Sequence, residues 1–143
     1  MGKKRIIKQT GHDAGGVKTR TVSRSSKKRI ERGVLYVQAT YNNTALLLAD
    51  SAGNAILSSS SGALGYKGSK KGTPYAAGKV GELLAEKAQA LGLKEVDVII
   101  KGVGSGRESS VRAFIAKGVG ILSIKDKTPV PFNGPKAPKP RRV

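Results

Sequence analysis

Three lysines and a tyrosine lie among three glycines in the segment Gly65–Gly72, whose sequence is GYKGSKKG. Glycine lets a backbone approach a phosphate closely, lysine neutralises the phosphate, and tyrosine stacks on a base or a ribose. On its own the segment is equally typical of a flexible, solvated loop. Because strongly basic segments lie at both ends of the chain, we interpret it as an RNA contact made by the side chains of Tyr66, Lys67, Ser69, Lys70 and Lys71.

A second glycine-rich segment, GVGSGR, runs from Gly102 to Arg107, between an expected strand and an expected helix. Backbone N–H groups at such a helix N-terminus can hold an anion. The spacing G-x-G-x-G differs from the dinucleotide-binding G-x-G-x-x-G, and the chain contains no P-loop pattern. A tight structural turn is the simpler reading. We favour a phosphate seat for nucleic acid, with Arg107 as a bidentate partner.

A third polar cluster comprises Asn42, Asn43 and Thr44. Asparagine tolerates positive φ, so these residues are typical of a hairpin turn. Their amides and hydroxyl also suit hydrogen bonds to ribose and phosphate. Both interpretations stay open for this cluster.

Catalytic chemistry has little support in the sequence. The chain has no cysteine and one histidine, which excludes disulfides, thiolate metal sites, cysteine nucleophiles and multi-histidine metal sites. A ribonuclease-H-like two-metal nuclease needs several converging carboxylates, whereas Asp97 stands alone and Asp50 is expected in a distant turn. We therefore predict no enzymatic activity, no cofactor, no metal site and no small-molecule substrate.

The composition instead demands a polyanionic partner. The 143 residues include 27 Lys and Arg against 9 Asp and Glu, a net charge of +18. No apolar run approaches the length of a membrane span, and no apolar stretch follows the basic N-terminus as in a secretory signal. We expect a soluble intracellular protein without a membrane partner.

The position of the charge suggests three parts. Residues 1–32 carry 11 basic and 2 acidic side chains, and residues 125–143 carry 6 basic and 1 acidic. We expect residues 1–32 to be a basic N-terminal extension, disordered when free, because it has too few apolar residues to form a core. Residues 33–126 form a globular domain. Residues 127–143 form a Pro/Lys/Arg-rich extension with polyproline-like character.

Within the domain, changes of hydrophobic period predict five strands and two helices. Thr73 and Pro74 have the residue types of an N-cap and first helical position, and Ser105 and Glu108 have the spacing of a capping box. The first strand is almost entirely apolar, which is typical of burial on both faces. The strands are expected at 33–41, 45–49, 55–60, 95–101 and 121–125, and the helices at 74–91 and 106–117.

Short turns make the first three strands antiparallel neighbours, and the helix between the last two strands makes those two parallel. The predicted fold class is α/β: a three-layer, ribonuclease-H-like fold with a five-stranded mixed sheet in the order 3-2-1-4-5 and strand 2 antiparallel. Strands 1, 3, 4 and 5 then end at one edge, which gathers the three polar segments and the C-terminal extension. The N-terminal extension enters from the opposite edge.

Four ordered motifs resemble the eleventh protein of the small ribosomal subunit, bacterial type. They are ATYNNT, GYKGSKKGTPYAA, KGVGSGRE and DKTPVPFNG, beginning at residues 39, 65, 101 and 126. The similarity covers residues 33–134 and, in character, the basic ends. The chain departs from the family where Val103 replaces a usual proline, where Phe132 replaces a usual histidine, and in the run after Gly134.

This resemblance implies a non-enzymatic structural constituent of the small subunit. Its members bind ribosomal RNA on the platform, bridge several RNA helices and form part of the Shine–Dalgarno cleft near the messenger exit. The implied partners are small-subunit ribosomal RNA, ribosomal proteins seven and eighteen, the messenger RNA region and initiation factor three. A cytoplasmic ribosome is favoured over an organellar one, because the N-terminus lacks transit-peptide amphipathicity.

The resemblance also indicates RNA-binding residues beyond the loops described above. They are Ser105 in the third motif and Arg112 just beyond it. Apart from the resemblance, we also expect RNA contacts from the polar residues of the C-terminal extension, namely Asn133, Lys136, Lys139, Arg141 and Arg142. The pair Asn133-Gly134 is an isoaspartyl site in this family, so Asn133 is a candidate for modification. The alternative to all of this is a general basic protein that compacts nucleic acid, which the tails alone do not exclude.

Overall fold

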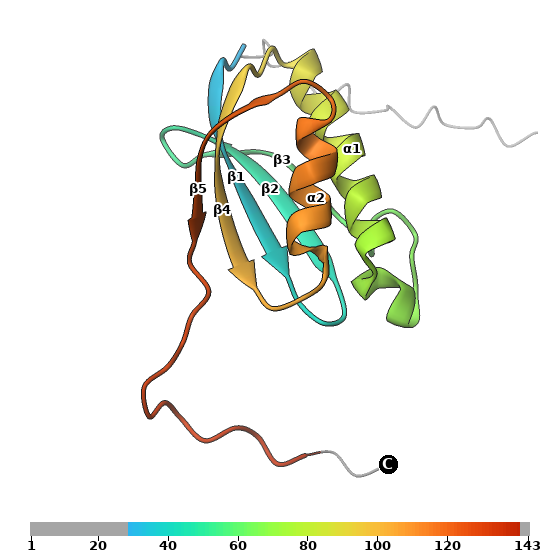
Figure 1. The fold of residues 1–143 in the computed structure, drawn as a ribbon, viewed down its shortest axis with the longest axis vertical. Helices are drawn as coiled ribbons and strands as arrows, with labels where there is room; N and C mark the ends of the chain where they lie inside the picture. The colour runs from blue at the N-terminus through green and yellow to red at the C-terminus, as the bar shows by residue number, and fades with distance from the viewer. Residues whose placement is uncertain (1–28, 141–143) are drawn as a thin grey trace, which may run out of the picture.

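The computed structural model describes residues 29–140, which form one mixed sheet with two helices packed against it (Figure 1). The strands are β1 (Arg32–Ala39), β2 (Thr44–Asp50), β3 (Ala55–Ser60), β4 (Glu95–Gly102) and β5 (Gly120–Asp126). The helices are α1 (Pro74–Ala90) and α2 (Gly106–Ile115), preceded by the short 3₁₀ helix η1 (Gly68–Gly72). The expectations for residues 1–28, including disorder, and for Arg141 and Arg142 lie outside the described residues.

The sheet has the predicted order, β3-β2-β1-β4-β5. β2 is antiparallel to both of its neighbours, while β1, β4 and β5 are mutually parallel. Val37 of β1 lies opposite Leu46 of β2 and Ile100 of β4, so apolar residues align across the centre of the sheet. The α/β fold and its sheet topology are therefore confirmed.

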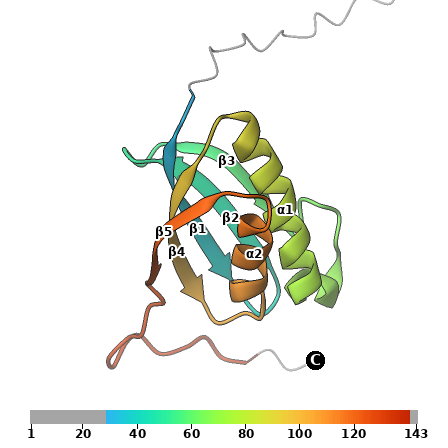
Figure 2. The same cartoon turned by 45° about the horizontal axis from the view of Figure 1, so that its top comes forward.

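Both helices lie on the same face of this sheet (Figures 1 and 2). α1 connects β3 to β4 and α2 connects β4 to β5, so both crossovers advance in the same direction along the sheet. Right-handed crossovers that advance in one direction place their helices on one face. After β5 the chain leaves as an extension, so the described residues make two of the three expected layers.

The core fills the space between the sheet and the helices. Phe114 of α2, Leu84 of α1 and Leu35 and Leu48 of the sheet are all fully buried. β1 was expected to be buried on both faces, but its burial alternates, and Tyr36 is 38% exposed. That expectation was wrong because no helix among the described residues covers the second face, and an apolar sequence alone does not reveal a missing layer.

The two helices begin differently. Thr73 Oγ1 accepts a hydrogen bond of 3.3 Å from the Ala76 N–H, and Pro74 opens α1, which confirms the predicted cap. The capping box predicted for α2 is absent: Ser105 is itself helical, with φ −67° and ψ −13°, and makes no side-chain cap. Its hydroxyl donates instead to the Gly72 carbonyl at 2.8 Å.

The first described residues are attached to the domain. The Ile30 N–H donates to the Leu91 carbonyl at 3.1 Å, and Ile30 packs against the core. The Glu31 carbonyl accepts hydrogen bonds from the backbone N–H groups of Lys94 and Glu95. Among the described residues, Ile30 and Glu31 therefore already contact the domain, ahead of the expected boundary at residue 33.

Candidate nucleic-acid interface

Four segments leave the sheet at the carboxyl ends of β1, β3, β4 and β5, at the lower end of the molecule in Figure 1. They are residues 40–43, 61–72, 102–107 and 127–140, and together we call them the carboxyl-end surface. The prediction that the polar segments share one edge is confirmed by the sheet topology.

Three of these segments are held together by their backbones. A Cβ atom on Gly72 would lie 2.1 Å from the Tyr41 carbonyl oxygen, and one on Gly104 would lie 2.2 Å from that of Thr40. Both positions therefore require glycine for close packing. The hydrogen bond from Ser105 Oγ to the Gly72 carbonyl joins the second and third loops. The glycines of the GVGSGR segment thus serve a tight structural turn.

The loops of the carboxyl-end surface carry exposed cationic side chains. Lys67 and Lys70 are exposed and Lys71 is half-buried. Among the residues that the structure describes, no carboxylate lies within ion-pair distance of these three lysines. Their charge is therefore available to an external anion.

Helix ends add to the positive potential here. α1 and α2 both begin at the carboxyl-end surface, and the N-terminal end of a helix carries partial positive charge on its free N–H groups. The first turn of α1 contains no acidic side chain, and that of α2 contains only Glu108. With so few carboxylates, these helix ends suit the binding of an anion such as phosphate and not the binding of a cation.

The asparagine cluster divides into two kinds of residue. Asn42 is exposed at the tip of the β1–β2 turn, while Asn43 Oδ1 accepts a hydrogen bond from the Gly62 N–H at 3.3 Å. Thr44 is fully buried and would collide with a side chain at Gly106. The predicted RNA contact thus falls on a buried side chain: Thr44 is the first residue of β2, and strand alternation directs its side chain inward.

Arg107 is already occupied within the protein. Its guanidinium donates hydrogen bonds to the Gly102 carbonyl, to Thr128 Oγ1 and to the Asp126 carboxylate. Hydrogen bonds from Thr128 and then from Arg107 lower the pKa of the Asp126 carboxyl to about 2. The expected bidentate phosphate contact does not agree with this geometry. Arg107 instead joins the third loop to the start of the C-terminal extension.

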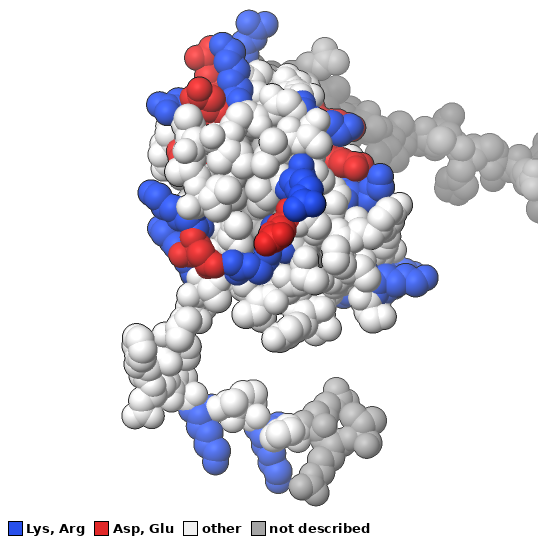
Figure 3. All heavy atoms as spheres, in the orientation of Figure 1, with Lys and Arg blue, Asp and Glu red and all other residues white. Residues whose placement is uncertain are grey.

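Beyond Thr128, which Arg107 holds by a hydrogen bond, the C-terminal extension leads away from the domain. Asn133, Lys136 and Lys139 are exposed, and Asn133 has a positive φ of 50° immediately before Gly134. Figure 3 shows positive side chains along the extension and no negative ones. It therefore forms a cationic projection from the carboxyl-end surface.

Two further candidates lie beside the loops. Tyr66 is half-buried and lines a shallow depression with Lys79 and Glu82 of α1, so only part of its ring is free for stacking. Arg112 is exposed on α2 and lines a groove shared with Ser105. Both residues border the carboxyl-end surface.

Exposed aromatic residues were missed by the sequence reasoning. Tyr41 is 78% exposed beside Asn42, and Tyr75 is 68% exposed in the first turn of α1, with Lys79 Nζ 5.7 Å from its ring centroid. Both have the stacking chemistry that RNA-binding surfaces use. Their positions in the sequence could have identified them, because Tyr41 directly precedes the Asn-Asn turn and Tyr75 directly follows Pro74.

The carboxylates do not converge. Asp97 accepts a hydrogen bond from Ser123, whereas Asp50 binds Asn54 in the turn at the opposite edge. Among residues 29–140 no three His, Cys, Asp or Glu residues come together as a metal site. No helix in that part of the chain is long and apolar enough to cross a membrane.

One protein family model matches this chain. The family model described as ribosomal protein S11 matches residues 33–142, which include all of the sheet except Arg32, both helices and nearly all of the C-terminal extension. The match thus spans all four segments of the carboxyl-end surface. Because it covers most of the chain, this protein belongs to the ribosomal protein S11 family.

Proposed function

We propose that the carboxyl-end surface is the principal ribosomal RNA contact of this chain. As a family member, the protein is a structural component of the small ribosomal subunit and associates with ribosomal RNA and other ribosomal proteins. The observation that carries the proposal is the gathering of Lys67, Lys70 and Lys71, free of carboxylate partners among the described residues, on one backbone-fastened edge with two helix N-termini.

The geometry suggests how the surface works. The lysines neutralise phosphates, Asn42 and Tyr41 meet unpaired nucleotides, and the fastened loops hold these groups in fixed relative positions. Residues 127–140 reach about 45 Å when fully extended, enough to meet an RNA helix other than the one under the loops. One rigid surface plus one projection therefore suits a protein that bridges several RNA helices.

We further propose that the chain sits on the platform of the subunit and forms part of the Shine–Dalgarno cleft. Ribosomal proteins seven and eighteen, the messenger RNA region and initiation factor three are its proposed neighbours, in a cytoplasmic rather than an organellar ribosome. The support for this is the resemblance carried by the four motifs. Protein footprinting of small subunits with and without this chain tests the placement.

The RNA contact is tested by paired charge removal in the full chain. Lys70→Gln with Lys71→Gln removes two cations from the carboxyl-end surface, whereas Lys87→Gln with Lys94→Gln removes two from elsewhere. We expect the first variant to bind a platform ribosomal RNA fragment about tenfold more weakly, with a salt slope lower by one to two. Filter binding over a salt series measures both quantities.

The control variant should change affinity by less than about twofold, because its lysines lie away from the surface. Equal losses for both variants, or equal affinity for duplex DNA and ribosomal RNA, would instead favour general nucleic-acid compaction. RNA cleaved during incubation with magnesium would contradict the non-enzymatic assignment.

We also propose Asn133 as a modification site. Its exposed side chain and the absent side chain of Gly134 leave the Gly134 backbone nitrogen free to attack the Asn133 amide carbon, with loss of ammonia. Water then opens the succinimide to isoaspartate. Isoaspartyl methyltransferase labelling should be lost in Asn133→Gln, and labelling that persists would place the modification elsewhere.

A further inference from the structure

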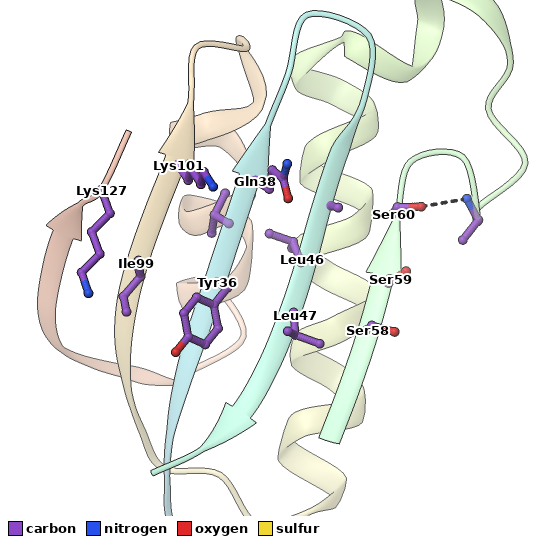
Figure 4. A pocket seen from close by; sticks show the side chains of 13 residues that line it. Tyr36, Gln38, Leu46, Leu47, Ser58, Ser59, Ser60, Ile99, Lys101 and Lys127 are labelled. Carbon is purple, nitrogen blue, oxygen red and sulfur yellow. Dashed lines mark hydrogen bonds between the residues drawn. The ribbon is translucent and has the colours of Figure 1, made fainter. Parts of the chain in front are cut away.

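The sheet face opposite the helices holds a cavity of about 730 Å³ (Figure 4). Its centre is an apolar row across three strands, in which Tyr36 of β1 lies between Leu47 of β2 and Ile99 of β4. The strand register extends this row to Ser58 on one side and Lys125 on the other. The sheet thus presents an apolar stripe between a serine side and a lysine side.

A second row runs beside the first, nearer the carboxyl ends of the strands. The register aligns Ser60, Ala45, Gln38 and Lys101 in that order, and Lys127 also lines the cavity. All charged residues that line the cavity are therefore lysines, and they lie on its β4–β5 side. Asp97, two residues before Ile99 in β4, accepts a hydrogen bond from Ser123, and Asp126, next to Lys127, is bonded to Arg107 and Thr128.

An antiparallel or mixed sheet face that meets only water normally carries polar side chains at alternate positions. Here Tyr36, Leu47 and Ile99 occupy those positions. Apolar groups gathered in an open groove and bordered by polar residues are typical of interaction surfaces. The groove adjoins the carboxyl-end surface, to which its lining residues Ala63 and Lys127 belong, but none of the η1 lysines line it.

We propose that this face binds an acidic segment of a neighbouring protein in the small subunit. Apolar side chains of that segment fill the groove over Tyr36, Leu47 and Ile99, and its carboxylates meet Lys101 and Lys127. The proposal depends on the chain being a subunit component and not on the carboxyl-end surface being its RNA contact.

Charge and shape favour this occupant over the others. Residues 1–28 of this chain are strongly basic, and a second copy would bring its own lysines to the same groove, so both would be repelled. A single-stranded RNA needs several stacking platforms, whereas Tyr36 is the one aromatic residue lining the cavity. An acidic, partly apolar peptide satisfies both the lysines and the apolar row.

Photo-cross-linking in assembled small subunits tests the proposal. The full chain carries Tyr36→p-benzoylphenylalanine, and a matched chain carries the same residue at the exposed Tyr75 on α1. We expect the first chain to form a ribonuclease-resistant adduct with another ribosomal protein. Mass spectrometry should find a cross-linked segment with apolar residues and net negative charge, which the Tyr75 chain does not capture.

Charge reversal provides the second measurement. Lys127→Glu in the Tyr36-substituted chain should reduce the adduct at least fivefold, whereas Lys87→Glu, which changes net charge equally, should leave it within about twofold. If the Tyr36 substitution prevents folding, the photoreactive residue at the exposed Ser58 repeats the test. The proposal is overturned by an adduct with RNA, with residues 1–28, with a second copy or with a basic segment, or by incorporation without any adduct.

Discussion

Basic side chains have different surroundings at the two ends of the parallel strands β1 and β4. At the amino ends of β1 and β4, Arg32 pairs with Glu95 at 3.4 Å and Lys94 pairs with Glu31 at 3.1 Å. At the carboxyl-end surface, the lysines of η1 have no such partners among the described residues. Among the described residues, the basic side chains of Arg32 and Lys94 are paired within the protein at one edge, whereas the η1 lysines at the other are left to the external polyanion that we propose.

The backbones of the two edges differ as well. The turn between β2 and β3 is self-contained: Asp50 accepts hydrogen bonds from Asn54, and the space around Gly53 is open. At the carboxyl-end surface, glycines let neighbouring loops touch through their backbones. The edge that we propose as the RNA contact is therefore also the edge whose loops are held in fixed positions, which would lower the entropy lost on binding.

The largest expected effect contrasts a packed glycine with an open one. Gly102 and Gly53 both have positive φ, but a Cβ on Gly102 would lie 2.0 Å from the Ala39 carbonyl oxygen. We expect Gly102→Ala to lower the free energy of unfolding by more than about 3 kcal/mol. The alanine would adopt a strained positive φ, and the backbone at Ala39 would also have to move to make room for the Cβ atom. Gly53→Ala should cost about 1 kcal/mol. Urea unfolding measures both, and equal costs would mean that the loops are not fastened together.

A smaller effect on RNA affinity is expected at Arg107. The question here is whether Arg107 positions the C-terminal extension or contacts a phosphate directly. Arg107→Ala removes the donors to Gly102, Thr128 and Asp126, so the start of the C-terminal extension should exchange its amide hydrogens faster. RNA affinity should fall less than in the Lys70/Lys71 variant. An equal or larger fall, with unchanged exchange at Thr128, would restore Arg107 as a direct phosphate ligand.

Acid should loosen the carboxyl-end surface in a defined pH range. The Asp126 carboxyl has a pKa of about 2 in the folded chain against 3.8 ordinarily, so its contribution is complete above about pH 4. The contribution is lost as pH falls through about 2. The Thr128 amide resonance, whose N–H donates to Asp126, should shift over this range and should not shift in Asp126→Asn.

The smallest effect is expected away from the carboxyl-end surface. The exposed pair between Lys117 and Glu86 spans 2.8 Å, and Lys117 lowers the pKa of the Glu86 carboxyl. Exposed ion pairs contribute little to stability, so Glu86→Gln should move the melting temperature by no more than about 1 °C. RNA affinity should rise slightly or stay unchanged, and a marked loss would show that the balanced part of the molecule also matters for binding.

Local chemistry made much of the fold and part of the site predictable. The Asn42-Asn43 turn and the Thr73-Pro74 start of α1 are short-range signals, and both appear where expected. The surroundings of Thr44, Ser105 and Arg107 could not be predicted, for one shared reason. Thr44 is buried beside Gly106, Ser105 donates to Gly72 in place of the predicted cap, and Arg107 donates to Asp126, all of which are distant in the chain, so no local pattern reveals them.

The sequence by itself determined the excess of positive charge, the order of the strands and helices, and the edge at which the polar loops meet. These follow from residue type, local period and the handedness of crossover connections. Only the tertiary structure decided which cations remain free, because a charge is free only if no distant carboxylate reaches it. It alone also revealed the uncovered sheet face around Tyr36, because covering that face depends on a layer that the described chain does not supply.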